Sequence, residues 1–190
     1  MKLLQSHAHP GIGFFTSVAV LLAAPVVVAE QAELVDRAKE AGLADAPGYG
    51  KAVSMVDVNG DGWEDLWDSN TNRRPPSPDS FKPYDLGIDP DHLEFTWGAA
   101  WADFDNDGDP DLLLGSGGFL GEGSLALYEN RWKEEQKLVK LPAGISTAKR
   151  QWWGVSWADF NNDGCLDFAA IARKNREWVY QSNCDKTFTE

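Results

Sequence analysis

The sequence predicts an all-β fold, and three observations support this prediction. An Asp/Asn-rich segment occurs three times, and the first aspartates of its copies, Asp57, Asp103 and Asp159, lie 46 and 56 residues apart. Bulky and small residues alternate ahead of the second and third copies, with the period of two that is typical of β-strands. Nine tryptophans and nine phenylalanines supply the large apolar surfaces that β-rich cores bury.

Residues 1–29 are predicted to be a secretory signal. They hold one charged residue, Lys2, and an apolar run over residues 14–28, and Val27 and Ala29 stand where a signal peptidase reads small residues. The run is shorter than the roughly 20 residues of a membrane-spanning helix, although an uncleaved anchor is the alternative. We therefore expect a secreted, periplasmic or cell-surface protein, with no membrane insertion once the signal is removed.

The charge of the chain argues against two classes of partner. Its formal net charge is −13, and loss of Lys2 with the signal would make it −14. A protein this acidic is repelled by nucleic acids and by anionic membrane surfaces. We therefore expect neither as a partner.

The repeated segment has the form D-x-[DN]-x-D-G-x-x-D, and each copy is expected to form a turn between two strands. The spacing of the copies suits one four-stranded blade of a β-propeller per repeat. The predicted architecture is therefore a partial β-propeller of about three four-stranded blades over residues 30–190, with a loop of this form in each. The blades would cover about residues 31–85, 86–140 and 141–190, and we name residues 57–65, 103–111 and 159–167 loop 1, loop 2 and loop 3.

The strands ahead of loops 2 and 3 are predicted to have one bulky and one small face. A small face suits a strand in the crowded position nearest a propeller axis. The tryptophans on these strands could pack between blades, or they could form a platform on which sugars stack. The predicted bulky residues are Trp97, Ala99, Trp101, Trp153, Val155 and Trp157, and the small ones are Gly98, Ala100, Ala102, Gly154, Ser156 and Ala158.

Three further segments have weaker patterns. Residues 112–114 and 168–171 are short apolar runs that follow loops 2 and 3, and we expect them to be buried strands. Residues 72–79 are polar and rich in proline, which predicts an exposed insertion between strands. Residues 31–43 show some helical spacing, but an outer strand and its turn would fit them equally well.

The three loops are predicted to bind calcium, about one ion each. Calcium takes six to eight oxygen ligands in a flexible shell. Alternate residues at loop positions 1, 3 and 5 can direct short Asp or Asn side chains at one centre, and position 9 adds a carboxylate. Position 7 would contribute its backbone carbonyl, so its side chain is free to vary. The expected ligands are Asp57, Asn59, Asp61, Trp63 and Asp65 in loop 1, Asp103, Asp105, Asp107, Asp109 and Asp111 in loop 2, and Asp159, Asn161, Asp163, Cys165 and Asp167 in loop 3.

An EF-hand, a different metal ion or an empty acidic turn would fit the three loops less well. An EF-hand shares positions 1, 3, 5 and 6, but it needs a bidentate glutamate at position 12 and a helix on each side. Position 12 is Asp68, Leu114 and Ala170 in the three copies. Magnesium demands a tight octahedron and keeps its waters, and zinc prefers His and Cys ligands. An acidic turn without an ion would account for one copy, but three aligned copies favour ion sites.

These loops resemble the repeats of the FG-GAP/VCBS family, whose relatives include the propellers of integrin α-subunits. Residues 40–43, Gly50 and residues 187–190 are similar to the bacterial branch that includes cartilage-acidic-protein-like and UnbV-like proteins. The resemblance extends over about residues 31–190. It implies a β-propeller, usually of about seven blades, in which calcium binds in the hairpin between the first two strands of a blade and stabilises it.

The chain departs from that pattern because it has three such loops where a closed ring would need about seven. The resemblance therefore implies either an incomplete product or a propeller that another chain completes. Residues 179–190 are expected to form the outer hairpin of the third blade. Open blade edges would favour self-association.

Cys165 and Cys184 lie in predicted turns that would emerge at the same end of a four-stranded meander. A disulfide is favoured in an exported protein, with two free cysteines as the alternative.

The sequence contains no nucleophile elbow, zinc-protease helix or phosphate-binding glycine loop, so we expect no enzyme activity. The expected function is that of a structural or adhesive module with a protein or glycan partner. The alternative is a non-catalytic accessory propeller of a larger secreted enzyme that acts on polysaccharides.

Overall fold

The computed structural model describes residues 35–41, 52–68, 71–77, 80–83, 85–89, 96–117, 123–146, 148–174 and 176–190. The predicted signal and the segment that contains Gly50 lie outside these residues. Residues 36–190 belong to one compact unit. Among the described residues, no helix is long and apolar enough to cross a membrane. Of the ambiguous segment 31–43, residues 38–41 form a turn, in which the Ala41 N–H donates to the Arg37 carbonyl at 2.9 Å.

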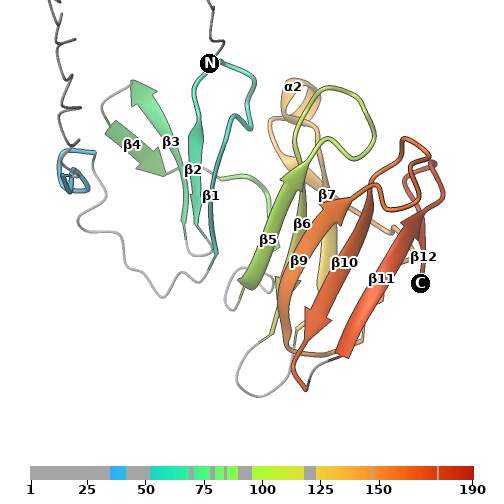
Figure 1. The fold of residues 1–190 in the computed structure, drawn as a ribbon. Coiled ribbons are helices and arrows are strands. Elements are labelled where there is room, and N and C mark those ends of the chain that lie inside the picture. Colours follow the sequence, from blue (N-terminus) through green and yellow to red (C-terminus); the bar gives the residue numbers. More distant parts are fainter. Residues whose placement is uncertain are drawn as a thin grey trace, which may run out of the picture. The chain divides into compact units, whose positions relative to one another are not determined.

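The described part of the chain forms three four-stranded antiparallel sheets (Figure 1), which confirms the predicted all-β class. In each sheet the strands lie in the order of the sequence. Sheet 1 consists of β1 (Val53–Val56), β2 (Asp65–Asp68), β3 (Thr71–Ser77) and β4 (Ser80–Pro83). Sheet 2 consists of β5 (Thr96–Ala102), β6 (Asp111–Ser116), β7 (Leu125–Asn130) and β8 (Leu138–Leu141). Sheet 3 consists of β9 (Trp152–Ala158), β10 (Asp167–Ala172), β11 (Arg176–Ser182) and β12 (Phe188–Thr189), and the short helix α2 (Trp132–Glu135) joins β7 to β8.

Two apolar cores hold these sheets together, one on each face of sheet 2. The pleat of β6 sends Leu112 and Leu114 into a core shared with Trp67 of sheet 1, and it sends Leu113 into a core shared with Trp152 of sheet 3. All three leucines are fully buried. Burial of each such side chain stabilises the fold by about 1.5–3 kcal/mol. The apolar run 112–114 is therefore a buried strand, as predicted.

The bulky face of the first strand of a sheet packs on the preceding sheet. The Trp101 ring meets Trp67 of sheet 1 edge-on, with centroids 6.3 Å apart. The Trp157 ring stacks on Phe104 of sheet 2 at 5.8 Å, and its Nε1–H donates to the Ala100 carbonyl at 3.2 Å. The structure therefore favours packing over a sugar platform for these two tryptophans.

The predicted alternation fails at one position in each of these strands. The register shifts between Thr96 and Gly98 on β5, and between Ile171 and Ala172 beside β9, so that the strand register skips Trp97 and Trp153. This is the extra residue of a β-bulge. Trp153 is 43% exposed, and its neighbour Trp152, which the predicted bulky face omits, is fully buried instead.

The small face allows β5 and β9 to approach each other closely. A Cβ atom on Gly98 would lie 2.9 Å from the Cα atom of Gly154, a distance that real Cβ contacts do not reach. Glycine is needed at this crossing because the two backbones are in contact. The first strand of the sheet is therefore crowded, as predicted, and in β5 the crowding comes from β9 of the neighbouring sheet.

Residues 71–77 correct one prediction. They belong to β3, which pairs with β2 and with β4, and they are not an inserted loop. Proline cannot donate to a sheet ladder, so prolines are confined to edges and bulges. Pro75 and Pro76 fall in the interval between Arg74 and Ser77, where the register with β4 shifts. The strand accommodates both prolines by breaking its ladder there.

Candidate functional site

The three loops share one pattern of internal hydrogen bonds, in which side-chain oxygens accept backbone N–H groups of the same loop. The carboxylate at position 1 accepts the N–H of position 5 at 3.0–3.1 Å and that of position 6 at 2.8–3.0 Å. The position 3 side chain also accepts the N–H of position 5, at 2.8–3.2 Å. The position 5 carboxylate accepts the N–H of position 7 at 2.9–3.0 Å. The spacing of the acidic residues therefore determines the fold of each loop.

Two backbone positions in each loop require a left-handed conformation. Position 6 is glycine in all copies and has φ between 88° and 92°, which glycine adopts at little cost. Position 4 has φ between 59° and 71°, and Asn is one of the few other residues that tolerate this region. Position 4 is Gly60, Asn106 and Asn162. The sequence thus contained a signal, Gly or Asn at position 4, that the motif D-x-[DN]-x-D-G-x-x-D leaves out.

The position 9 aspartate fastens each loop to the sheet behind it. Asp65, Asp111 and Asp167 are at most 2% exposed, and one oxygen of each accepts the N–H of loop position 2 at 3.0–3.2 Å. In loop 2 the second oxygen accepts the N–H of Asn130 at 2.8 Å, and in loop 3 it accepts the N–H of Ser182 at 2.7 Å. These two carboxylates therefore link the first hairpin of a sheet to its third strand.

Burial has a strong effect on one of these groups. Removal from water and the charge of Asp105 together raise the pKa of Asp111 to about 8, against the hydrogen bond from the Asn130 N–H, which lowers it. A buried carboxyl beside other carboxylates gives up its proton more readily when a cation is present. A cation bound in loop 2 would therefore favour loss of the proton from the Asp111 carboxyl.

The oxygens of loop 2 fit a calcium ion by their number and type. Side-chain oxygens of Asp103, Asp105 and Asp111 lie within 4.8 Å of one another. Calcium–oxygen bonds of 2.3–2.6 Å allow one ion to contact oxygens at that separation. In loop 3 a similar grouping joins Asp163 to Cys165 and Cys184, but both sulfurs belong to a disulfide and are not available as ligands.

The side chains at position 7 have three different surroundings. Trp63 is 56% exposed, Asp109 Oδ1 lies 2.7 Å from Lys133 Nζ, and Cys165 is bonded to Cys184. This variety is compatible with a position that acts through its backbone carbonyl.

The disulfide between Cys165 and Cys184 joins loop 3 to the turn between β11 and β12, over a sequence separation of 19 residues. Of the two alternatives left open by the sequence, the structure has the bridged one. The loop that carries it is otherwise hydrogen-bonded like loops 1 and 2, so the bridge adds a connection without changing the loop.

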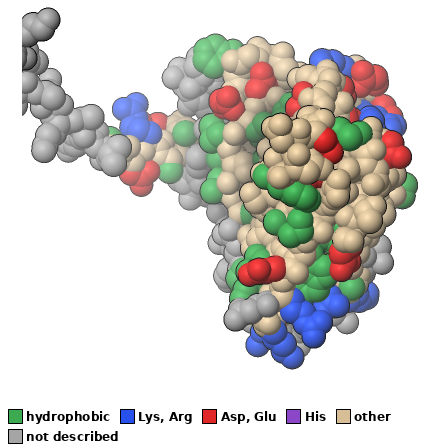
Figure 2. Space-filling view, turned by 45° about the vertical axis from the view of Figure 1, so that its right-hand side comes forward, with side chains coloured by type: hydrophobic (Ala, Val, Ile, Leu, Met, Phe, Trp, Pro, Cys, Tyr) green, Lys and Arg blue, Asp and Glu red, His purple; other side chains and the backbone are tan. Residues whose placement is uncertain are grey.

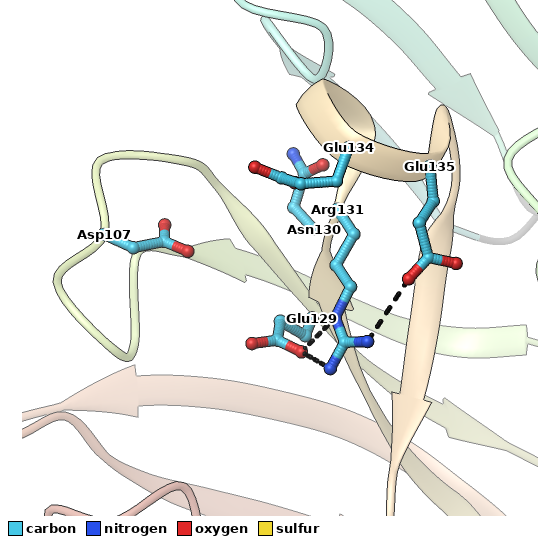
Figure 3. A pocket seen from close by; sticks show the side chains of 6 residues that line it. All are labelled: Asp107, Glu129, Asn130, Arg131, Glu134 and Glu135. Atoms are coloured by element: carbon cyan, nitrogen blue, oxygen red, sulfur yellow. Dashed lines mark hydrogen bonds and ion pairs between the residues drawn. The ribbon is translucent and has the colours of Figure 1, made fainter.

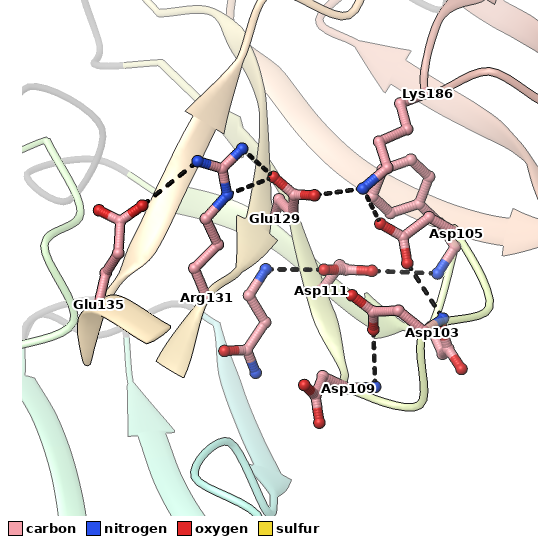
Figure 4. Close-up of polar contacts among 11 residues, drawn as sticks. Asp103, Asp105, Asp109, Asp111, Glu129, Arg131, Glu135 and Lys186 are labelled. Atoms are coloured by element: carbon pink, nitrogen blue, oxygen red, sulfur yellow. Dashed lines mark hydrogen bonds and ion pairs between the residues drawn. The ribbon is translucent and has the colours of Figure 1, made fainter. Parts of the chain in front are cut away.

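Loop 2 has basic partners that the sequence analysis missed. Lys186 Nζ, from the turn between β11 and β12, lies 2.6 Å from Asp105 Oδ2 and also contacts Glu129 Oε1 (Figure 4). These carboxylates raise the pKa of Lys186 above its ordinary value. Although burial alone would raise it, the bonds from Lys186 and Arg131 hold the pKa of Glu129 below its ordinary value. No local pattern could have revealed these pairs, because Lys186 lies 81 positions after Asp105.

A pocket of about 380 Å³ lies beside loop 2 and helix α2 (Figure 3). Arg131 lines it and is paired with Glu129 at 2.6 Å and with Glu135 at 3.3 Å. The six lining residues offer carboxylates, one amide and one guanidinium, and none of them is a histidine, serine or cysteine. They are Asp107, Glu129, Asn130, Arg131, Glu134 and Glu135.

Comparison with known proteins gives one result for the centre of the chain. Residues 103–170 match the family model described as an FG-GAP-like repeat. The matched segment contains loops 2 and 3, which have the same internal hydrogen bonds. No curated protein matches the chain. The predicted resemblance to FG-GAP-like repeats is therefore confirmed over residues 103–170.

Proposed function

We propose that the chain is an exported calcium-binding module of the β-propeller type, in which one calcium ion in each loop stabilises the sheet that carries it. The observation that supports this most directly is the convergence of Asp103, Asp105 and Asp111 oxygens within 4.8 Å. The three sheets would be three blades, and the chain would act as a structural or adhesive module without catalysis. The disulfide supports export, because such bonds persist mainly in oxidising compartments.

Loops 1 and 3 enter the proposal because they repeat the hydrogen bonds of loop 2. Their position 3 is Asn, whose amide oxygen is also a calcium ligand. Calcium would take oxygens from position 1, 3, 5 and 9 side chains and from the position 7 carbonyl. Each site would add about 1.4 kcal/mol to stability at a tenfold excess of calcium over its dissociation constant.

The test is a thermal melt of the protein exported by the expressing cells, in EDTA, in several millimolar calcium and in magnesium. We expect a calcium-specific rise in melting temperature that Asp103→Ala and Asp159→Ala each reduce. The matched control is Asp109→Ala, which removes a carboxylate from the same loop at a position that is not expected to coordinate through its side chain. Equal melting in EDTA and in calcium would remove calcium from the proposal, and the mass of the exported chain shows whether residues 1–29 are cleaved.

The exposed face of sheet 3 would suit packing against a further repeat unit. Phe104 of loop 2 and Leu127 of β7 are 4% and 0% exposed. Their equivalents in the next repeat, Phe160 of loop 3 and Val179 of β11, are each 53% exposed. Apolar side chains also reach the surface on the face drawn in Figure 2. We expect association between copies, and a monomer at micromolar concentration in light scattering would refute it.

A further inference from the structure

The side chain of Lys186 connects sheet 3 to the acidic loop of sheet 2. Its ammonium group lies 2.6 Å from Asp105 Oδ2 and contacts Glu129 Oε1. The two carboxylate side chains are only 5% and 8% exposed, whereas that of Lys186 is 45% exposed. Figure 4 shows the ammonium group between the two acids, at the edge of the loop. Two carboxylates that are largely removed from water thus share one cation supplied by the protein.

Lys186 contacts the oxygen of Asp105 that does not bond to the loop backbone. Asp105 Oδ1 already accepts the Asp107 N–H at 3.2 Å, as the position 3 side chain does in every loop. Oδ2 makes no hydrogen bond within the loop. The ammonium group on Oδ2 and a calcium ion held by the same carboxylate would compete for its negative charge.

Loop 2 differs from loops 1 and 3 at this same position. It has a carboxylate at position 3, where loops 1 and 3 have the neutral Asn59 and Asn161. The extra negative charge at position 3 of loop 2 is thus matched by Lys186. The lysine contact therefore belongs to the one loop that carries the extra charge, and it is not part of the pattern that the three loops share.

We propose that Lys186 is an internal counter-ion of loop 2, which neutralises Asp105 when no divalent ion is bound and must leave it when calcium binds. The inference rests on the proposed calcium function. Calcium would then bind loop 2 less tightly than the four carboxylates at positions 1, 3, 5 and 9 alone would allow. Its binding would also free Lys186, two residues after Cys184, so that occupancy of loop 2 would loosen the contact with the turn that the disulfide ties to loop 3.

The experiment compares Lys186→Met with Lys133→Met in the exported protein. Both variants remove one ammonium group from loop 2, but Lys133 pairs with Asp109, whose side chain is not an expected ligand. We expect calcium titration calorimetry to show about fivefold tighter binding at one site in Lys186→Met, at the lower end of typical coupling between sites. We expect less than about a twofold change in Lys133→Met, because an exposed ion pair contributes little.

A second measurement separates competition from a loss of folding. In EDTA, Lys186→Met should melt below the wild type because Asp105 loses its cation and Glu129 keeps only Arg131. Saturating calcium should abolish that difference. In an Asp105→Asn background, which gives loop 2 the same residue type as loops 1 and 3, the Lys186→Met change should have no effect on calcium affinity.

The outcomes distinguish this inference from the proposed function. Equal or weaker calcium binding by Lys186→Met, in a protein whose wild type binds calcium, would overturn the counter-ion role alone. A tighter site that persists in the Asp105→Asn background would also overturn it. Absence of calcium binding by the wild type and by both lysine variants would overturn the calcium function and the counter-ion role together.

Discussion

Loops 2 and 3 have the same internal hydrogen bonds but are held in place by different chemistry. Loop 3 is covalently tied to the turn between β11 and β12 through Cys165 and Cys184. Loop 2 is reached from that same turn by Lys186. The comparison shows that the acidic motif specifies the conformation of the loop, while residues far away in the sequence determine how firmly the loop is fastened to its surroundings.

The largest effect is expected where the two loops are alike. Asp111→Ala and Asp167→Ala would each leave two backbone N–H groups without their acceptor, those of Phe104 and Asn130 in loop 2 and those of Phe160 and Ser182 in loop 3. An unsatisfied buried donor costs about 1–3 kcal/mol. We expect each variant to lower the free energy of unfolding by about 2–5 kcal/mol, measured by urea denaturation in EDTA.

The control for this prediction is Asp109→Ala, at position 7 of loop 2. Its carboxylate pairs with Lys133, which is 58% exposed, and such surface pairs contribute less than about 1 kcal/mol. If Asp111→Ala were no more destabilising than this control, the hydrogen bonds of the position 9 carboxylates would not be what holds the loop to the sheet.

A somewhat smaller effect is expected from the covalent difference between the loops. Replacing both cysteines by alanine should lower the free energy of unfolding by about 3 kcal/mol, because a bridge over 19 residues limits the unfolded chain. Reducing agent should lower the stability of the wild type in chemical denaturation by a similar amount.

The double cysteine variant is the matched control, since it should not respond to the reducing agent. Equal stability of the oxidised wild type and the double variant would mean that the bridge does not distinguish loop 3 from loop 2.

The change that is smallest for each step of the measurement is expected from pH, and it concerns loop 2. Burial raises the pKa of Asp111 to about 8 from the ordinary value of 3.8. Between these values the folded protein holds a proton that the unfolded chain has lost, so stability should fall as pH rises from about 4 to about 8. One group changes the free energy of unfolding by at most about 1.4 kcal/mol per pH unit.

Urea denaturation in EDTA at several pH values measures this slope. Asp111→Asn, which cannot titrate, should reduce it, and calcium should reduce it as well because a bound cation favours the ionised carboxylate. A slope that is unchanged in Asp111→Asn would show that another group titrates.

The sequence predicted those parts of the fold that depend on local pattern. The loops, the buried strand at residues 112–114 and the small face of β5 and β9 each follow from residue types at fixed spacing. The bulges at Trp97 and Trp153 were not predictable in this way, because a bulge is a mismatch between two strands and cannot be read from one of them. Helix α2 is only four residues long, too short for a helical period to appear.

The candidate site was predictable to a similar degree. The carboxylates at positions 1, 3, 5 and 9 of loop 2 follow from the motif, and the convergence of those at positions 1, 3 and 9 needs only the local backbone. Asn130 and Lys186 were missed because each reaches the loop from a separate strand or turn. Their contribution depends on which strands become neighbours, and the motif contains no information about that.

The contact between Gly98 and Gly154 has a consequence for how such a chain can grow. The two glycines occupy the same position in successive repeats, counted from the loop that follows each strand, so this position packs against its own copy. When a unit of this kind is duplicated in tandem, the new unit brings a backbone surface that already fits the old one. A single change at Gly98 would therefore disturb the contact between two units and not only its own strand, which limits variation at this position.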